Sequence, residues 1–167
     1  PIIAALKERA HHGIFGYTET NADYAVPIQG WWKEHYQFNI ETDWIVKTPT
    51  IVYSMTAAVR AFTQPGDPVL IQQPVYHPFK NVVSVNHRRP VSSDLILRNG
   101  KYYMDFENLE KTIREQQIKL FLLCSPHNPV GRVWTKAELQ KVGEICKQYD
   151  VLLLSDEIHC DFTWSGN

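Results

Sequence analysis

The chain has 167 residues, a length typical of one domain, and its 44% hydrophobic and 21% charged residues are typical of a globular protein. Its 17 Lys and Arg residues nearly balance 18 Asp and Glu residues, so the net charge of −1 gives no reason to expect nucleic acid or an anionic membrane as a partner. No apolar run approaches the roughly 18 residues that a membrane span needs. Cys124, Cys146 and Cys160 are irregularly spaced, which favours a reduced, cytoplasmic location over a disulfide framework.

The first part of the sequence predicts helices joined by loops. Apolar residues at helical spacing predict a helix over residues 2–11, and the loop HHGIFGYTET follows it. Residues 23–38 predict a second, aromatic-rich helix, with Pro27 in its first turn or at a kink. DWIVKTP, residues 43–49, predicts a short strand. Because the chain starts without Met in a helical pattern and stops soon after an apolar run, we expect it to be part of a longer protein.

The middle of the sequence predicts alternating helices and strands. An apolar face over residues 51–62 predicts a helix, which the breakers in QPGDP end. Residues 69–72 predict a strand, and PVYHPF opens a helix that extends to Asn86. Residues 90–105 predict a hairpin, because RNGKYY carries an Asn-Gly turn.

The last third of the sequence predicts a crossover between parallel strands. A helix over residues 106–117 precedes a strand at 119–124, a helix at 135–148 and a strand at 151–155. Both strands are continuous apolar runs, as expected of parallel strands that are covered on both faces. The whole pattern predicts an α/β fold, a three-layer sandwich with a mainly parallel central sheet.

Two polar segments follow these two strands. Because parallel strands end at one edge of a sheet, where open α/β sheets bind ligands, Asn128 and Asp156 are expected on the same side. An acid at the mouth of a buried strand is desolvated and needs a partner, such as a cationic ligand atom. Taken alone, an Asp in the position of Asp156 is more often a cap or ion-pair member than a ligand contact, and an Asn between prolines, like Asn128, is usually a turn residue. His159 and Cys160 lack the spaced ligands of a structural zinc site, so we predict no metal.

Taken together, these segments resemble a known family. SPHNPVGRVW followed by LLLSDEIHCDF is similar to the pyridoxal phosphate enzymes of the aminotransferase fold, class I and II. HHGIFGYT, AVRAFTQPGDPVLIQQPVYHPF and NGKYYMDFENLE resemble the cystathionine β-lyase branch, also called C-S lyases, so the resemblance covers nearly all of the chain. It implies that residues 1–167 are part of the large cofactor-binding domain of a fold type I enzyme, with pyridoxal 5′-phosphate as cofactor.

The resemblance assigns three residues to the cofactor ring. Asp156 matches the carboxylate that keeps the pyridine nitrogen protonated, so that the ring acts as an electron sink. Asn128 matches the residue that donates to the phenolic oxygen O3′ of the ring. Tyr76 matches the aromatic residue that stacks on the ring, although ordinary core packing also explains a tyrosine there.

The resemblance places the cofactor phosphate at the helix that follows residues 45–49, where the amides of Thr50, Ile51 and Val52 are free to bind an anion. The sequence departs from the family here, because glycine is usual near Thr50 and proline near Tyr53. His159 stands where transaminases of this fold usually carry a tyrosine near O3′, and the histidine resembles the lyase branch.

The resemblance also implies site residues that come from the neighbouring subunit or from beyond residue 167. Tyr17 matches a tyrosine that reaches the neighbouring subunit's site near the phosphate, which implies a homodimer with shared active sites. The lysine that forms a Schiff base with the cofactor, and the arginine that binds the substrate carboxylate, are expected beyond residue 167. No catalytic residue is therefore expected within the chain.

The resemblance implies a carbon–sulfur β-lyase. Its small-molecule substrates would be amino acids of the cystathionine or cysteine type, and its products pyruvate, ammonia and a thiol. Two alternatives remain open: an aminotransferase on the same platform, and a transcription regulator that uses such a domain as an effector sensor behind a DNA-binding helical domain. The DEIH segment, in place of Asp-x-x-Tyr, favours the lyase branch.

Overall fold

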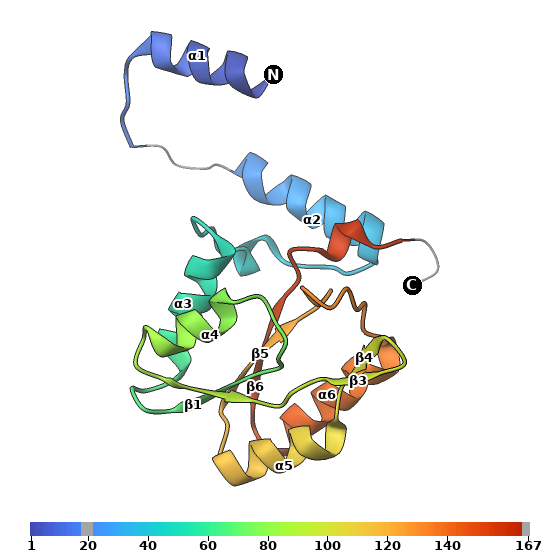
Figure 1. Ribbon diagram of the computed structural model, residues 1–167. Helices are drawn as coiled ribbons and strands as arrows, with labels where there is room; N and C mark the ends of the chain where they lie inside the picture. The colour runs from blue at the N-terminus through green and yellow to red at the C-terminus, as the bar shows by residue number, and fades with distance from the viewer. Residues whose placement is uncertain (18–21, 165–167) are drawn as a thin grey trace. The chain divides into compact units, whose positions relative to one another are not determined.

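The computed structural model describes residues 1–17 and 22–164 and divides into two compact units, Pro1–Lys47 and Thr48–Asn167 (Figure 1). Residues 18–20 of the predicted loop HHGIFGYTET lie outside the described residues. The assignment of residues 1–167 to part of one large domain stays a prediction.

The first unit consists mainly of helices. Its elements are α1 (Ile2–His12), α2 (Ala22–Tyr36) and the short 3-10 helix η1 (Thr42–Trp44). Both predicted α-helices are confirmed. Helix α1 ends at Gly13, whose φ of 73° lies in the left-handed region and whose N–H donates to the Arg9 carbonyl. Pro27 lies inside α2, beyond its first turn, so the first-turn placement is wrong.

The strand predicted over residues 43–49 is wrong. The Ile45 N–H donates to the Thr42 carbonyl at 3.3 Å and closes a 3-10 turn. In the described part of the chain, no residue of 43–49 belongs to a sheet. An extended segment needs a neighbouring strand for its N–H and C=O groups, and a short apolar run does not supply one. Trp44 and Val46 are accordingly exposed rather than packed on a sheet face.

The second unit is built on a four-stranded sheet of order β2-β1-β5-β6 among the described residues. The strands are β1 (Pro68–Ile71), β2 (Arg89–Ser92), β5 (Leu120–Cys124) and β6 (Leu152–Asp156). Every neighbouring pair is parallel. The predicted α/β class and parallel central sheet are therefore confirmed, and so is the crossover from β5 to β6.

The hairpin predicted over residues 90–105 is shorter than expected. Only β3 (Ile96–Arg98) and β4 (Lys101–Tyr103) pair in antiparallel fashion. Asn99 and Gly100 form the turn with φ of 50° and 74°, as an Asn-Gly turn requires. The residues before the hairpin form β2 instead, because the free edge of β1 offers them parallel partners from Arg89 to Ser92.

Helices cover both faces of this sheet (Figure 1). They are α3 (Ile51–Phe62), α4 (Pro78–Ser84), α5 (Phe106–Gln116) and α6 (Lys136–Gln148), and η2 (Cys160–Phe162) follows β6. Alternate residues of β5 point to opposite faces: Leu122 packs in a core with α3 and α4, and Phe121 in a second core with α5 and α6. The two cores leave the carboxyl edge of the sheet open for a site.

Candidate functional site

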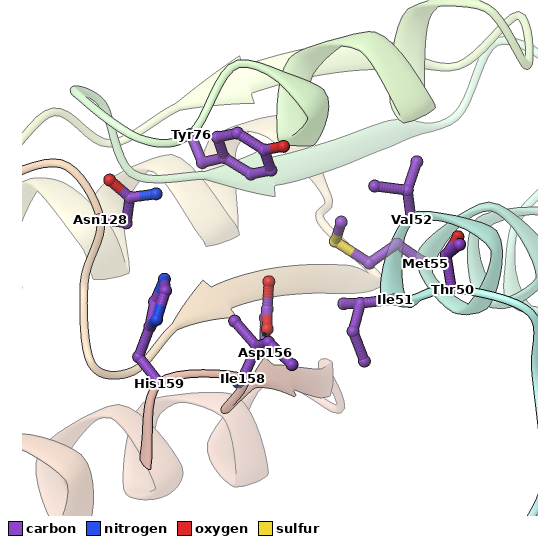
Figure 2. A pocket seen from close by; sticks show the side chains of 9 residues that line it. All are labelled: Thr50, Ile51, Val52, Met55, Tyr76, Asn128, Asp156, Ile158 and His159. Carbon is purple, nitrogen blue, oxygen red and sulfur yellow. Dashed lines mark hydrogen bonds between the residues drawn. The ribbon is translucent and has the colours of Figure 1, made fainter. Parts of the chain in front are cut away.

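A cavity of about 360 Å³ lies at the carboxyl edge of the sheet, within the second unit (Figure 2). The residues that line it are Thr50, Ile51, Val52, Met55, Tyr76, Asn128, Asp156, Ile158 and His159. The first residues of α3 close one end of the cavity, and Asn128 and His159 lie at the other. The fold therefore brings together seven of the eight residues that the sequence assigned to a cofactor; Tyr17 belongs to the other unit and is fully exposed.

Asp156 provides a buried carboxylate at the centre of the cavity. It is the last residue of β6 and only 7% exposed. Its Oδ1 accepts from the Ile158 N–H at 3.2 Å, and no Lys, Arg or His of the described ranges forms an ion pair with it. Because an unpaired buried charge is costly, the carboxylate suits a cationic ligand group in the cavity.

Asn128 is held by its backbone rather than by its side chain. Its N–H donates to the Cys124 Sγ at 3.4 Å, and its carbonyl accepts from the Tyr76 N–H at 2.9 Å. The Cys124 thiol in turn donates to the Pro126 carbonyl at 3.4 Å, and burial raises the pKa of this thiol to about 11. The side-chain amide of Asn128 is left to face the cavity (Figure 2).

Tyr76 presents its ring to the cavity from the loop after β1. The side chain is 40% exposed, which rules out an ordinary core position. The ring contacts that of His77 edge-on, with 5.1 Å between the ring centroids. An aromatic face that borders a cavity in this way is suited to stack on a planar ligand.

The start of α3 provides backbone donors at one end of the cavity. Thr50 is the N-cap, and its Oγ1 accepts from the Tyr53 N–H at 3.1 Å. The amides of Ile51 and Val52 precede any possible intrahelical acceptor, and the helix dipole favours an anion beside them. The helix start was predicted correctly, although the strand expected before it is absent among these residues.

His159 borders the cavity beside Asn128 (Figure 2). It also lines a second cavity of about 380 Å³, which Asn128 shares. The two residues therefore stand where the two cavities meet, and His159 is exposed.

Met55 and Ile158 line the cavity although the sequence did not single them out for a site. Met55 falls one turn after Ile51 on the same face of α3, and this spacing was the available signal. Ile158 lies between Asp156 and His159 and carried no signal of its own. Both add apolar surface around the polar groups.

The described residues show neither a metal cluster nor a membrane span. No group of three or more His, Cys, Asp or Glu side chains in residues 1–17 and 22–164 is arranged to hold a metal ion. Within the same ranges, no helix combines the length and apolar character that crossing a bilayer requires.

Residues 2–167 match the family model for aminotransferase class I and II. The chain belongs to this family. It is 41% identical to cystathionine beta-lyase PatB of Bacillus subtilis over 166 residues, which are 99% of this chain and 43% of that protein.

Several solved structures are similar to this chain, among them a cystalysin and a C-S lyase. Cystalysin from Treponema denticola, whose crystal structure contains a pyridoxal 5′-phosphate cofactor, matches with a TM-score of 0.91 and 42% identity over 99% of this chain and 42% of that chain. The pyridoxal phosphate-bound C-S lyase of Staphylococcus hominis matches with a TM-score of 0.91 and 38% identity over 99% and 43%. The chain therefore spans less than half of the length of these relatives.

Proposed function

We propose that the cavity holds pyridoxal 5′-phosphate and that the full-length protein is a carbon–sulfur β-lyase. Its substrates would be amino acids of the cystathionine or cysteine type, cleaved to pyruvate, ammonia and a thiol. The buried carboxylate of Asp156, without a cation among the described residues and inside a cavity, is the observation that carries the proposal. The similarity to cystathionine beta-lyase PatB and to pyridoxal phosphate-bound C-S lyases supports it.

The residues that line the cavity fit this cofactor. Asp156 would pair with the protonated pyridine nitrogen, Asn128 would donate to the phenolic oxygen, and Tyr76 would cover one face of the ring. The amides of Ile51 and Val52 would hold the phosphate at the opposite end from Asn128. The cofactor, when bound, supplies an electron sink for the carbanion that forms at the substrate's α-carbon.

Each of these residues has a defined task. The Asp156 carboxylate favours the charged form of a nitrogen beside it, because opposite charges at short range raise the pKa of a base. The Asn128 amide stabilises negative charge on an oxygen, since a donor favours the ionised form of its acceptor. The exposed His159 imidazole, at the same end of the cavity as Asn128, would contact this oxygen or the substrate.

The chemistry also needs groups outside this chain. We place the Schiff-base lysine and the arginine for the substrate carboxylate beyond residue 167. We also propose a homodimer in the cytoplasm, in which Tyr17 reaches the neighbouring subunit's site. The fully exposed side chain of Tyr17 and the unpaired thiols of the cysteines are compatible with these two points.

The test is pyruvate release from cystathionine by the full-length protein loaded with pyridoxal phosphate. Lactate dehydrogenase and NADH would report pyruvate without any added keto acid. A lyase gives pyruvate and homocysteine under these conditions. Product that forms only with a keto acid acceptor, together with an equal amount of amino acid from that acceptor, would assign the protein as an aminotransferase instead.

A further inference from the structure

His127 is buried next to Asn128 and does not line the cavity proposed for the cofactor; it lines the second cavity, which Asn128 shares. The residue is 2% exposed and immediately precedes Asn128 in the turn after β5. Its backbone is fixed on both sides: its N–H donates to the Arg132 carbonyl at 2.7 Å, and its carbonyl accepts from the Gly131 N–H at 2.8 Å. A buried histidine with a fixed backbone has a ring of defined direction.

The ring of His127 donates a hydrogen bond to another segment. Its Nε2 lies 3.0 Å from the Pro74 carbonyl oxygen, and because a carbonyl only accepts, Nε2 carries the proton. Burial lowers the pKa of His127 below its usual 6.5, which keeps the ring neutral near pH 7. The ring also meets Trp134 edge-on, at 5.5 Å between centroids and 89° between planes.

Trp134 packs against the His127 ring and is itself anchored to the end of β5. Its Nε1 donates to the Cys124 carbonyl at 3.0 Å, at the end of β5. The guanidinium of Arg132 lies over the Trp134 ring at 4.7 Å. The imidazole of His127 is therefore held between the end of a strand and the Pro74 carbonyl.

The hydrogen bond to Pro74 ties together two walls of the cavity. Pro74 lies two residues before Tyr76, and the Tyr76 N–H donates to the Asn128 carbonyl at 2.9 Å. The segment that carries Tyr76 and the segment that carries Asn128 are thus joined by two hydrogen bonds, one from the backbone and one from the His127 side chain. Figure 2 shows the side chains of Tyr76 and Asn128 facing the same cavity.

We propose that His127 is a positioning residue, which fixes Tyr76 relative to Asn128 and so sets the space for the cofactor ring. This inference rests on the proposed cofactor site. His127 acts through Pro74 and needs no contact with the cofactor or the substrate.

The test compares two substitutions in the full-length protein. His127→Phe keeps an aromatic edge against Trp134 but removes the donor, whereas His127→Gln keeps an amide donor close to the position of Nε2. We expect His127→Phe to speed hydrogen–deuterium exchange at the Tyr76 amide and to weaken pyridoxal phosphate binding, each by about tenfold. His127→Gln should keep both within about threefold of wild type. If His127→Phe does not fold, His127→Asn, whose amide is too short to reach Pro74, takes its place.

A matched control separates positioning from general loss of stability. Val142→Ala creates a cavity in the buried face of α6 and lowers the melting temperature, but it should change neither Tyr76 exchange nor cofactor affinity. Unchanged exchange and affinity in His127→Phe, or equal losses in His127→Phe and His127→Gln, would overturn the proposal. Wild-type protein that binds no pyridoxal phosphate would defeat the proposed function, and the exchange measurement would still decide whether His127 positions Tyr76.

Discussion

Cys124 and Asp156 are register partners at the ends of the parallel strands β5 and β6. This pairing fixes the site, because the turn that follows Cys124 starts level with the Asp156 carboxylate. The Ser125 N–H donates to the Asp156 carbonyl at 3.0 Å and continues the ladder by one residue. The hydrogen bond from the Asn128 N–H to the Cys124 sulfur holds the turn closed, so that Asn128 lies at the cavity.

The amide of Ile51 offers a selective test of the phosphate site. Ile51 is the first residue of α3, a position where proline is tolerated because its missing N–H has no intrahelical partner. We expect Ile51→Pro in the full-length protein to weaken pyridoxal phosphate binding about tenfold, since one donor to a charged group is lost. Affinity for pyridoxal, which lacks the phosphate, should not change.

Lys136→Pro is the matched control for this substitution. It places proline at the first position of α6, whose residues do not line the cavity. Its affinity for both compounds should equal that of wild type. Equal losses for pyridoxal and pyridoxal phosphate in Ile51→Pro would show that α3 does not hold the phosphate.

The cysteines should differ strongly in reactivity. Burial raises the pKa of both Cys124 and Cys146 to about 11, so that few thiolates form near pH 8. Cys160 is only partly buried. We expect iodoacetamide to alkylate Cys160 first and the other two only after unfolding, as mass spectrometry of tryptic peptides would report. Rapid labelling of Cys124 in the folded protein would contradict the packing of the turn.

His127 should make the protein less stable in mild acid. Its pKa is lowered on folding from 6.5, mainly by burial, so the unfolded chain takes up the proton more readily. The contribution of the neutral His127 ring to the free energy of unfolding is therefore fully present above pH 6.5. It is lost as the pH falls toward the pKa of His127 in the folded protein. Urea unfolding between about pH 5 and pH 8 should show a smaller loss in His127→Gln than in wild type. Parallel curves for the two proteins would show that His127 does not resist protonation in the fold.

The sequence allowed the crossover and several residues of the cavity lining to be predicted, because their signals are local. The apolar run that forms β5 is buried at every position, and its end fixes where Asn128 follows. The same holds for Asp156 at the end of β6 and for the helix that begins after Thr50. In each case one strand or helix end decides where the polar residue lies.

The predictions that the structure contradicts or extends depend on contacts between segments that are distant in the sequence. Residues 43–49 contain the short apolar run Trp44–Val46 and so resemble a strand, but a strand also requires a partner, and no local pattern states whether one exists. Residues 89–92 became an edge strand because β1 had a free side, which the hairpin signal nearby did not reveal. Met55 is 1% exposed, and its sequence position indicates only a core residue. Its place in the wall of the cavity follows from tertiary packing, which no local pattern shows.

The dissociation constant of pyridoxal phosphate decides whether Asp156 pairs with the pyridine nitrogen of the cofactor. Asp156→Asn in the full-length protein keeps the size of the side chain but removes the charge that would pair with the pyridine nitrogen. We predict binding about 10-fold to 150-fold weaker, because a hydrogen bond to a charged group contributes about 1.5–3 kcal/mol and Asp156 is buried. Glu157→Gln, which changes the neighbouring exposed acid, should bind like wild type. An unchanged dissociation constant for Asp156→Asn, or an equal loss in Glu157→Gln, would contradict the assignment of this cavity to the cofactor.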